Sequence, residues 1–182
     1  MKRNKKIVLV AHCLLNSNSK VEGLAQYEGA LKEAVNLIID SGVGIVQLPC
    51  PELSSYGIKR WGHVKEQFDT PYFREHCREI FGPYLKQIKD YLAADYEILA
   101  LIGIDGSPSC GVNKTCSGKW GGEFLSSSDL KKKIDTLSFS KEPGVFIEEI
   151  IKILKQEKIE IPIIAIDEEN PQNIKNKIQK IL

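Results

Sequence analysis

Three cysteines occupy similar places in the sequence and have the side chain that thiol or metal chemistry needs. Cys13, Cys50 and Cys110 each come shortly after a largely apolar run. The runs are residues 7–11, 44–48 and 98–104. A deprotonated cysteine is a nucleophile and a soft ligand for iron, zinc and copper. Three such side chains in equivalent positions indicate a shared site more strongly than any one of them alone.

The apolar runs predict strands, because a short apolar run bounded by polar residues is typical of a strand buried on both faces. Residues 161–166 predict a fourth strand of the same kind. Helical patterns separate the strands, with helices expected over about 27–40, 71–93, 146–154 and 171–182. This alternation predicts an α/β fold, a three-layer Rossmann/flavodoxin-like domain with a mainly parallel sheet of about four strands. We expect the strand order 2-1-3-4, and a break or kink at Gly82-Pro83 in the second helix.

The predicted fold brings the three cysteines to one edge of the sheet. In a parallel sheet the carboxyl ends of the strands meet at one edge, where such folds bind their ligands. Adjacent strands lie about 4.8 Å apart, so Cys13, Cys50 and Cys110 can converge on one metal centre. A structural zinc site takes four ligands, often in closely spaced cysteine pairs, and the sequence has no such pair. Three thiolates without an obvious fourth ligand suit an iron–sulfur cluster with one open iron.

The segments around these cysteines are expected to be loops. Pro49 and Pro51 flank Cys50 and predict a stiff, extended segment there. The stretch 112–143 has little periodicity and is rich in glycine, serine and lysine, with a short helix expected near 128–134. An irregular segment of this length is uncommon in a compact domain unless it has a role, often as a lid or as a wall of a site.

The other candidates near the predicted edge are interpreted differently. Cys77 lies on the apolar stripe of the predicted 71–93 helix, where a core thiol is expected. Cys116 follows Cys110 closely in a glycine-rich segment, and a role as a fourth ligand or sulfur acceptor stays open for it. His12 immediately precedes Cys13, and its side chain is expected to point away from the cysteine if the strand pattern continues.

Length, composition and charge narrow the class of protein. The 182 residues suit a single α/β domain, 1–182, with one core. The formal net charge is +1 with both signs mixed along the chain, which gives no electrostatic reason to expect nucleic-acid or membrane binding. The apolar run 7–11 after the basic start is too short for a signal or membrane segment. We therefore expect a cytoplasmic protein whose five cysteines are reduced.

Three short motifs resemble those of a known family. They are Ala11-His12-Cys13-Leu14-Leu15-Asn16, Pro49-Cys50-Pro51-Glu52 and Ser107-Pro108-Ser109-Cys110-Gly111. In this order and spacing they resemble the signatures of the thiouracil desulfidase family, long catalogued as a domain of unknown function. The chain length and the α/β order are similar too, and the resemblance covers about residues 7–120. The serine-proline-serine-cysteine-glycine turn is the most specific of the three.

The resemblance implies a cofactor and a reaction. A [4Fe–4S] cluster would be held by Cys13, Cys50 and Cys110, and sulfur would be removed from a thiocarbonyl compound without net redox change. The sulfur would bind the open iron, which acts as a Lewis acid, and Glu52 and Ser107 would lie next to the attacking water. The residue types agree, because a carboxylate can accept a proton from water and a hydroxyl can orient it. A helix-capping or surface role for Glu52 and a turn-forming role for Ser107 are the alternatives.

Departures from the family pattern concern the substrate side of the site. The family usually has a small residue where His12 stands, a glycine where Asn16 stands, and a glycine-leucine-proline-rich stretch where this chain has residues 53–61. We therefore expect a related branch acting on a thiolated small molecule that the motifs do not identify. Asn16, Arg60 and Trp61 are the candidates for substrate binding, since Arg60 and Trp61 can pair with or stack on a flat ring. An ordinary amphipathic loop explains the same residues equally well.

Two other functions stay open at this point. A non-catalytic iron–sulfur or metal-binding carrier would need the cysteines but not Glu52 and Ser107, whose presence favours an enzyme. A nucleotide-binding flavodoxin-like protein would have a glycine-rich phosphate loop after the first strand, where residues 13–16 stand instead. The leading hypothesis is therefore an iron–sulfur desulfidase.

Overall fold

A parallel sheet of four strands forms the centre of the fold. The computed structural model describes residues 2–168 and 170–182. The order in the sheet is β2-β1-β3-β6, and every neighbouring pair is parallel. The strands are β1 (Lys6–Val10), β2 (Gly44–Gln47), β3 (Glu97–Ile104) and β6 (Ile163–Ile166). The predicted fold class and strand order are both confirmed.

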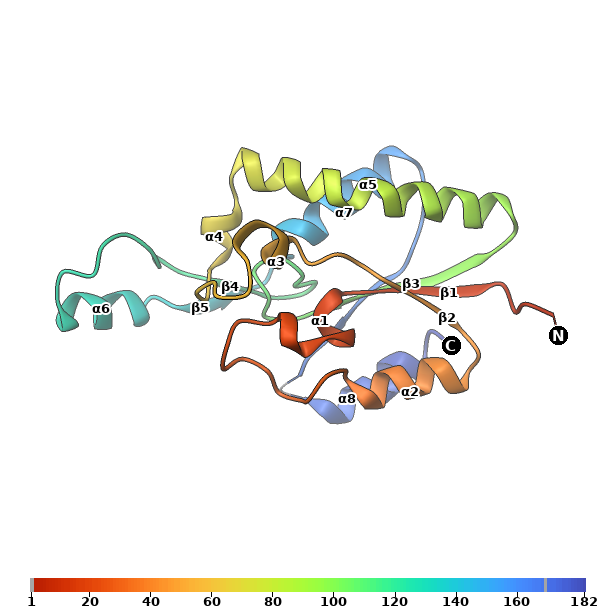
Figure 1. The fold of residues 1–182 in the computed structure, drawn as a ribbon, viewed down its shortest axis with the longest axis horizontal. Coiled ribbons are helices and arrows are strands. Elements are labelled where there is room, and N and C mark those ends of the chain that lie inside the picture. Colours follow the sequence, from red (N-terminus) through yellow and green to blue (C-terminus); the bar gives the residue numbers. More distant parts are fainter. Residues whose placement is uncertain (1, 169) are drawn as a thin grey trace.

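Helices cover both faces of the sheet and give three layers (Figure 1). One layer contains α5 (Pro71–Ala93) and α7 (Val145–Gln156), and the other contains α2 (Lys32–Asp40) and α8 (Pro171–Gln179). Because both faces are covered, β1 and β3 carry consecutive apolar residues and are buried over most of their length. No helix in the described part of the chain is long and apolar enough to cross a membrane.

The long helix α5 is continuous where a break or kink was expected. It contains both Gly82 and Pro83, so the helix is not interrupted at these residues. A proline inside a helix removes one backbone hydrogen bond. Apolar packing compensates for this loss, because the neighbouring Phe81 is fully buried and meets Phe146 of α7 edge-on, with ring centroids 6.3 Å apart.

The helix α2 is shorter than predicted, because the residues before it are hydrogen-bonded to the segment that follows β1. It begins at Lys32 rather than near residue 27. The Tyr27 hydroxyl donates to the Cys13 carbonyl at 3.1 Å, and the Leu31 N–H donates to the Leu14 carbonyl at 2.8 Å. The sequence before Lys32 therefore forms turns over the carboxyl edge of the sheet instead of a further helical turn.

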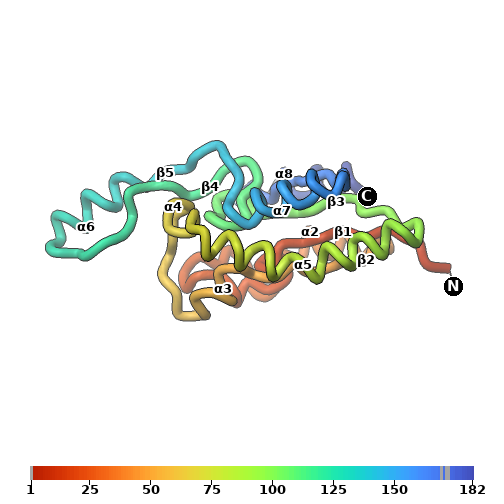
Figure 2. Tube along the Cα trace, turned by 90° about the horizontal axis from the view of Figure 1, so that it is seen from above, coloured from red at the N-terminus to blue at the C-terminus, as the bar shows by residue number. Residues whose placement is uncertain are grey.

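Residues 115–140 form a projection that we call the arm. It contains β4 (Thr115–Ser117), α6 (Ser127–Ile134) and β5 (Ser138–Ser140), with β4 and β5 antiparallel. The short helix was predicted, but the two-stranded ribbon was not. Figures 1 and 2 show α6 at the far end of the molecule, outside the three layers, and none of its residues is buried. The arm is held at its root, where the Trp120 Nε1 donates to the Gly62 carbonyl at 3.0 Å.

An ion-pair network joins α5 to α7. The Glu149 side chain on α7 is only 4% exposed and accepts hydrogen bonds from Arg74 at 2.7 Å, Arg78 at 2.9 Å and Lys152 at 2.8 Å. Burial alone would raise the pKa of Glu149, but these three hydrogen bonds outweigh it and lower the pKa to about 2. The folded state therefore favours the ionised carboxylate.

Acidification is expected to remove the stabilisation that this network supplies. Because the folded pKa of Glu149 lies below its ordinary value of 4.5, the contribution is present above about pH 4.5 and is lost as the pH falls toward 2. Glu149→Gln should lower the free energy of unfolding by about 2 kcal/mol at pH 7 and by much less at pH 3. Urea unfolding at both pH values measures this, with the exposed Glu75→Gln as control. Equal losses at both pH values would contradict the assignment.

Candidate functional site

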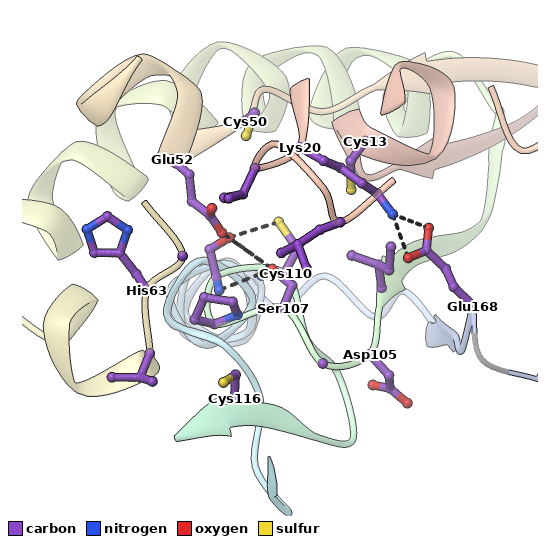
Figure 3. Close-up of a pocket in the computed structure, with 18 of the residues that line it drawn as sticks. Cys13, Lys20, Cys50, Glu52, His63, Asp105, Ser107, Cys110, Cys116 and Glu168 are labelled. Atoms are coloured by element: carbon purple, nitrogen blue, oxygen red, sulfur yellow. Dashed lines mark hydrogen bonds and ion pairs between the residues drawn. The ribbon is translucent and has the colours of Figure 1, made fainter. Parts of the chain in front are cut away.

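The three cysteines predicted to converge line one cavity at the carboxyl edge of the sheet (Figure 3). Cys13 lies in the short helix α1 (His12–Leu15), directly after β1. Cys50 follows β2, and Cys110 lies in the turn after β3. Each thiol follows a different strand, and the order β2-β1-β3 makes the three strand ends neighbours. The sheet topology thus brings together residues that are far apart in the sequence.

Cys50 has the extended backbone that was predicted, with φ −96° and ψ 109°, but a helix that was not predicted begins at the next residue. It is the N-cap of α3 (Pro51–Tyr56), and its sulfur accepts a hydrogen bond from the Leu53 N–H at 3.4 Å. Pro51 is compatible with this helix because the first helical position needs no N–H partner and prefers the φ value that proline imposes. The helix places Glu52 in its first turn, buried beside the cysteines.

A network of hydrogen bonds holds the turn that carries Cys110. The Asp105 carboxylate accepts the backbone N–H groups of Val112 at 3.1 Å, Asn113 at 2.8 Å and Lys114 at 3.3 Å. Ser107 Oγ accepts the Cys110 N–H at 3.0 Å. Two glycines complete the turn.

Those glycines are required for different reasons. Gly106 has φ +90°, a conformation that residues with a Cβ rarely adopt. A Cβ on Gly111 would collide with the backbone oxygens of Lys114 and Ser107. The thiol of Cys110 is therefore presented on a turn with little freedom to move.

The Glu52 carboxylate connects the cysteine turn to the rest of the site. Its Oε1 accepts a hydrogen bond from Ser109 Oγ at 2.6 Å and lies 3.5 Å from Ser107 Oγ. Its Oε2 accepts a hydrogen bond from Arg60 Nε at 3.2 Å. The structure thus brings Glu52 and Ser107 together as expected, but the shorter contact is made by Ser109. Sequence reasoning missed Ser109, although it stands in the same motif.

Burial raises the pKa of all three cysteines and disfavours their thiolate forms, and neighbouring cysteines add to the rise at Cys13 and Cys110. Burial raises the pKa of Cys13 to about 12, with the Lys20 charge opposing and Cys50 adding to the rise. Burial likewise raises the pKa of Cys50. For Cys110 burial comes first and the neighbouring Cys13 and Cys50 follow, and together they raise its pKa well above the usual range. A thiol with a raised pKa becomes a thiolate only beside a compensating positive charge. A metal bound here would therefore displace the protons of these thiols.

The three thiols form a set of soft sulfur donors along one cavity. No group of three His, Cys, Asp or Glu side chains within residues 2–168 and 170–182 is arranged closely enough to hold one ion. The thiols of a cluster are spread more widely, because each one binds a different iron. Three soft sulfur donors along a shared cavity are compatible with a cluster that has one open iron.

The cavity beyond the thiols has a volume of about 420 Å³ and room for a small molecule. Its wall opposite the sheet comes from the root of the arm, through Trp120, Leu137 and Phe139. The arm therefore forms a side of the site, as a segment of this length suggested. Cys116 also lines the cavity, and Figure 3 shows it away from Cys13 and Cys50.

Of the three residues predicted to bind substrate, two lie outside the cavity lining and the third is bound to another side chain of the site. Asn16 lies outside the cavity lining, and its side chain accepts a hydrogen bond from Asn18. Trp61 is 76% exposed and also lies outside the lining, while Trp120 provides an indole in the cavity. Arg60 lines the cavity but is buried and directed at Glu52. Sequence reasoning could not distinguish the two tryptophans, because both stand in segments without periodicity.

Two histidines of the lining have a ring nitrogen that is buried and lacks a hydrogen-bond partner. They are Nε2 of His12 and Nδ1 of His63. The His63 ring is held by Phe68, with centroids 4.8 Å apart, and by Tyr56 at 5.0 Å. Buried polar atoms in proteins usually have a partner, so these nitrogens are available to a bound molecule. His12 was expected to point away from Cys13, yet it lines the cavity.

A charged pair borders the cavity on the Cys13 side. Lys20 forms an ion pair with Glu168, and its ammonium lies 4.9 Å from the centre of the Tyr27 ring. Both partners are largely buried, with side-chain exposures of 10% and 14%. The pair links the loop after α1 to the loop after β6 and puts a positive charge near the thiols.

Cys116 and Cys77 are separate from the three-thiol group. The pKa of Cys116 is raised by burial and by Glu66, and none of the three cysteines contributes to it. Cys77 is fully buried in the hydrophobic core on α5, as predicted. All five thiols are unpaired.

Comparisons with known proteins give one relative of similar sequence. The chain is 42% identical over 112 residues to the uncharacterized protein MJ0003 of Methanocaldococcus jannaschii, and the alignment covers 62% of this chain and 71% of that protein. No family model matches the chain. No solved structure matches it either.

Proposed function

The chain belongs to the same family as this archaeal protein, and we propose that it is an iron–sulfur-dependent desulfidase acting on a thiolated small molecule. The observation that carries the proposal is the meeting of three thiols and a hydrogen-bonded carboxylate in one cavity. The reaction replaces sulfur by oxygen from water at a thiocarbonyl carbon and releases hydrogen sulfide. No electrons are gained or lost in this exchange, so no oxidant or reductant is needed.

Cys13, Cys50 and Cys110 are the residues that would hold a [4Fe–4S] cluster. Such a cluster, bound by three cysteines, supplies a Lewis-acidic iron suited to a soft thiocarbonyl sulfur. The five unpaired cysteines suit a reducing compartment, and we place the protein in the cytoplasm.

Glu52 is the group that accepts the proton from the attacking water. Its Oε2 is engaged by Arg60, which leaves Oε1, on the side of Ser107 and Ser109, for the water. Ser107 is partly exposed to the cavity, so its hydroxyl can contact both the water and Glu52. A carboxylate and a hydroxyl placed in this way hold the water and remove its proton as it attacks. A carrier of iron or sulfur would have no use for this arrangement.

The cavity wall contributed by the arm would pack against the ring of the substrate. Trp120 and Phe139 offer flat apolar surfaces there. The unpaired nitrogens of His12 and His63 can bind polar groups on the ring edge. We therefore assign a flat, uncharged thiocarbonyl heterocycle as the substrate class.

Anaerobic reconstitution followed by an isotope experiment tests the proposal. The protein is loaded with iron and sulfide, and its iron and acid-labile sulfide are quantified. It is then incubated with 2-thiouracil, 4-thiouracil and thionicotinamide in water enriched in oxygen-18. We expect one sulfide released for each oxo product, with the heavy isotope in the new carbonyl. Absence of cluster uptake, or uptake without sulfide release from any compound, would reject a desulfidase.

A further inference from the structure

Arg60 is buried at the centre of the site, with a side-chain exposure of 3%. Its guanidinium donates to Glu52 Oε2 from Nε at 3.2 Å, to the Gly57 carbonyl from Nη1 at 3.2 Å, and to the Ser19 carbonyl from Nη2 at 2.8 Å. Two of its three nitrogens are thus engaged by α3 and its C-cap, and the third by the loop that contains Ser19. A side chain held in this way is not free to reach out and bind a substrate.

The contacts of Arg60 determine how the carboxylate of Glu52 is oriented. The carbonyls of Ser19 and Gly57 hold the guanidinium plane from two sides, because arginine donates from a rigid fork. The guanidinium in turn engages Oε2 and leaves Oε1 directed at Ser109 and Ser107. Without Arg60 nothing would fix Oε2, so the carboxylate could rotate and withdraw Oε1 from the serines.

We propose that Arg60 is a positioning residue, which aims Oε1 of Glu52 at the reacting water and takes no part in binding the substrate. This inference rests on the proposed function, because the role of Glu52 in proton transfer is part of it. The ion pair also supplies the positive charge that a buried carboxylate needs beside three thiols. Lysine cannot replace Arg60, since a single ammonium cannot bind two carbonyls and a carboxylate in one plane.

Kinetics separate a positioning role from substrate binding. In Arg60→Lys we expect kcat to fall by roughly 10²-fold, because small misplacements of a reacting group cost about that much. The KM should stay within about threefold of the wild-type value, and the iron content should be unchanged. Arg78→Lys is the matched control, since Arg78 binds Glu149 outside the site. A raised KM with an unchanged kcat would show that Arg60 binds substrate and would overturn the inference.

A crystal structure of the cluster-free Arg60→Lys protein tests the orientation of Glu52 without a measurement of enzyme activity. We expect the 2.6 Å contact between Ser109 Oγ and Glu52 Oε1 to be lost or lengthened beyond hydrogen-bond range. If Glu52 keeps its orientation, the inference fails even when the enzyme is active. If the wild type releases no sulfide, the proposed function fails while this comparison still tests the positioning.

A second variant covers the case in which Arg60→Lys does not fold. Arg60→Gln is shorter and uncharged, and its amide can still donate one hydrogen bond toward a carbonyl. Addition of guanidinium ion to this variant should recover kcat by about tenfold or more if the missing group acts by orienting Glu52. No recovery, in a folded variant that retains its iron, would count against the positioning role.

Discussion

Serine in place of Cys13, Cys50 or Cys110 is expected to abolish cluster binding. A serine hydroxyl is a hard, weakly acidic group and a poor ligand for iron compared with a thiolate. The three thiols line the same cavity, and their charges influence one another's pKa values. Each is therefore expected to be a separate ligand that neither of the other two can replace. After anaerobic reconstitution we expect iron to fall from about four per chain to below about one in each variant. Iron analysis and the visible absorption of the cluster measure this.

The remaining two cysteines provide controls made by the same substitution. Cys77→Ser changes a fully buried core thiol on α5, and Cys116→Ser changes a cavity thiol that none of the three others perturbs. Both should keep their full iron content, although the buried Cys77→Ser loses about 1–2 kcal/mol of stability because it buries a hydroxyl. Loss of iron in Cys116→Ser would make that residue a fourth ligand. Retention of iron in Cys110→Ser would refute the proposed cluster site.

The convergence of the cysteines could be predicted because it depends on topology. Apolar runs identified the strands, and their alternation with helices required parallel pairing and a common carboxyl edge. Once the order β2-β1-β3 holds, Cys13, Cys50 and Cys110 follow neighbouring strand ends whatever the detailed loop conformation is. Such inferences need only the period of hydrophobic residues and the chain order.

The partners of the site residues could not be predicted, because loop conformation decides them. Arg60 meets Glu52 only because the chain turns back after α3 at Gly57, which has φ +76°. Trp61, which follows Arg60, faces solvent. Trp120 lines the cavity instead, and its indole N–H donates a hydrogen bond to the Gly62 carbonyl. Neither outcome follows from residue type or periodicity. The start of a helix at Pro51 was missed for a related reason, since proline fits both an extended loop and a first helical position.

Removal of the Glu52 carboxylate is expected to stop the reaction while leaving the cluster in place. Glu52→Gln has nearly the same shape and can still accept a hydrogen bond from Arg60, but its amide cannot take a proton from water. The loss of a general base costs roughly 10²–10⁴-fold in rate, so we expect sulfide release to fall by about 10³-fold. Iron content should match the wild type, because Glu52 is not among the proposed ligands. Sulfide release near the wild-type rate would remove Glu52 from the mechanism.

The two serines allow the role of Glu52 to be resolved further. Ser109 is 1% exposed and donates to Glu52 at 2.6 Å, so its hydroxyl is already engaged in orienting the carboxylate. Ser107 is more accessible and lies 3.5 Å from the same oxygen, a separation that suits two groups sharing one water. We therefore expect Ser107→Ala to lower kcat by about 10²-fold and Ser109→Ala by only about tenfold. The reverse order would mean that the water lies on the Ser109 side and that the turn opens before the substrate reacts.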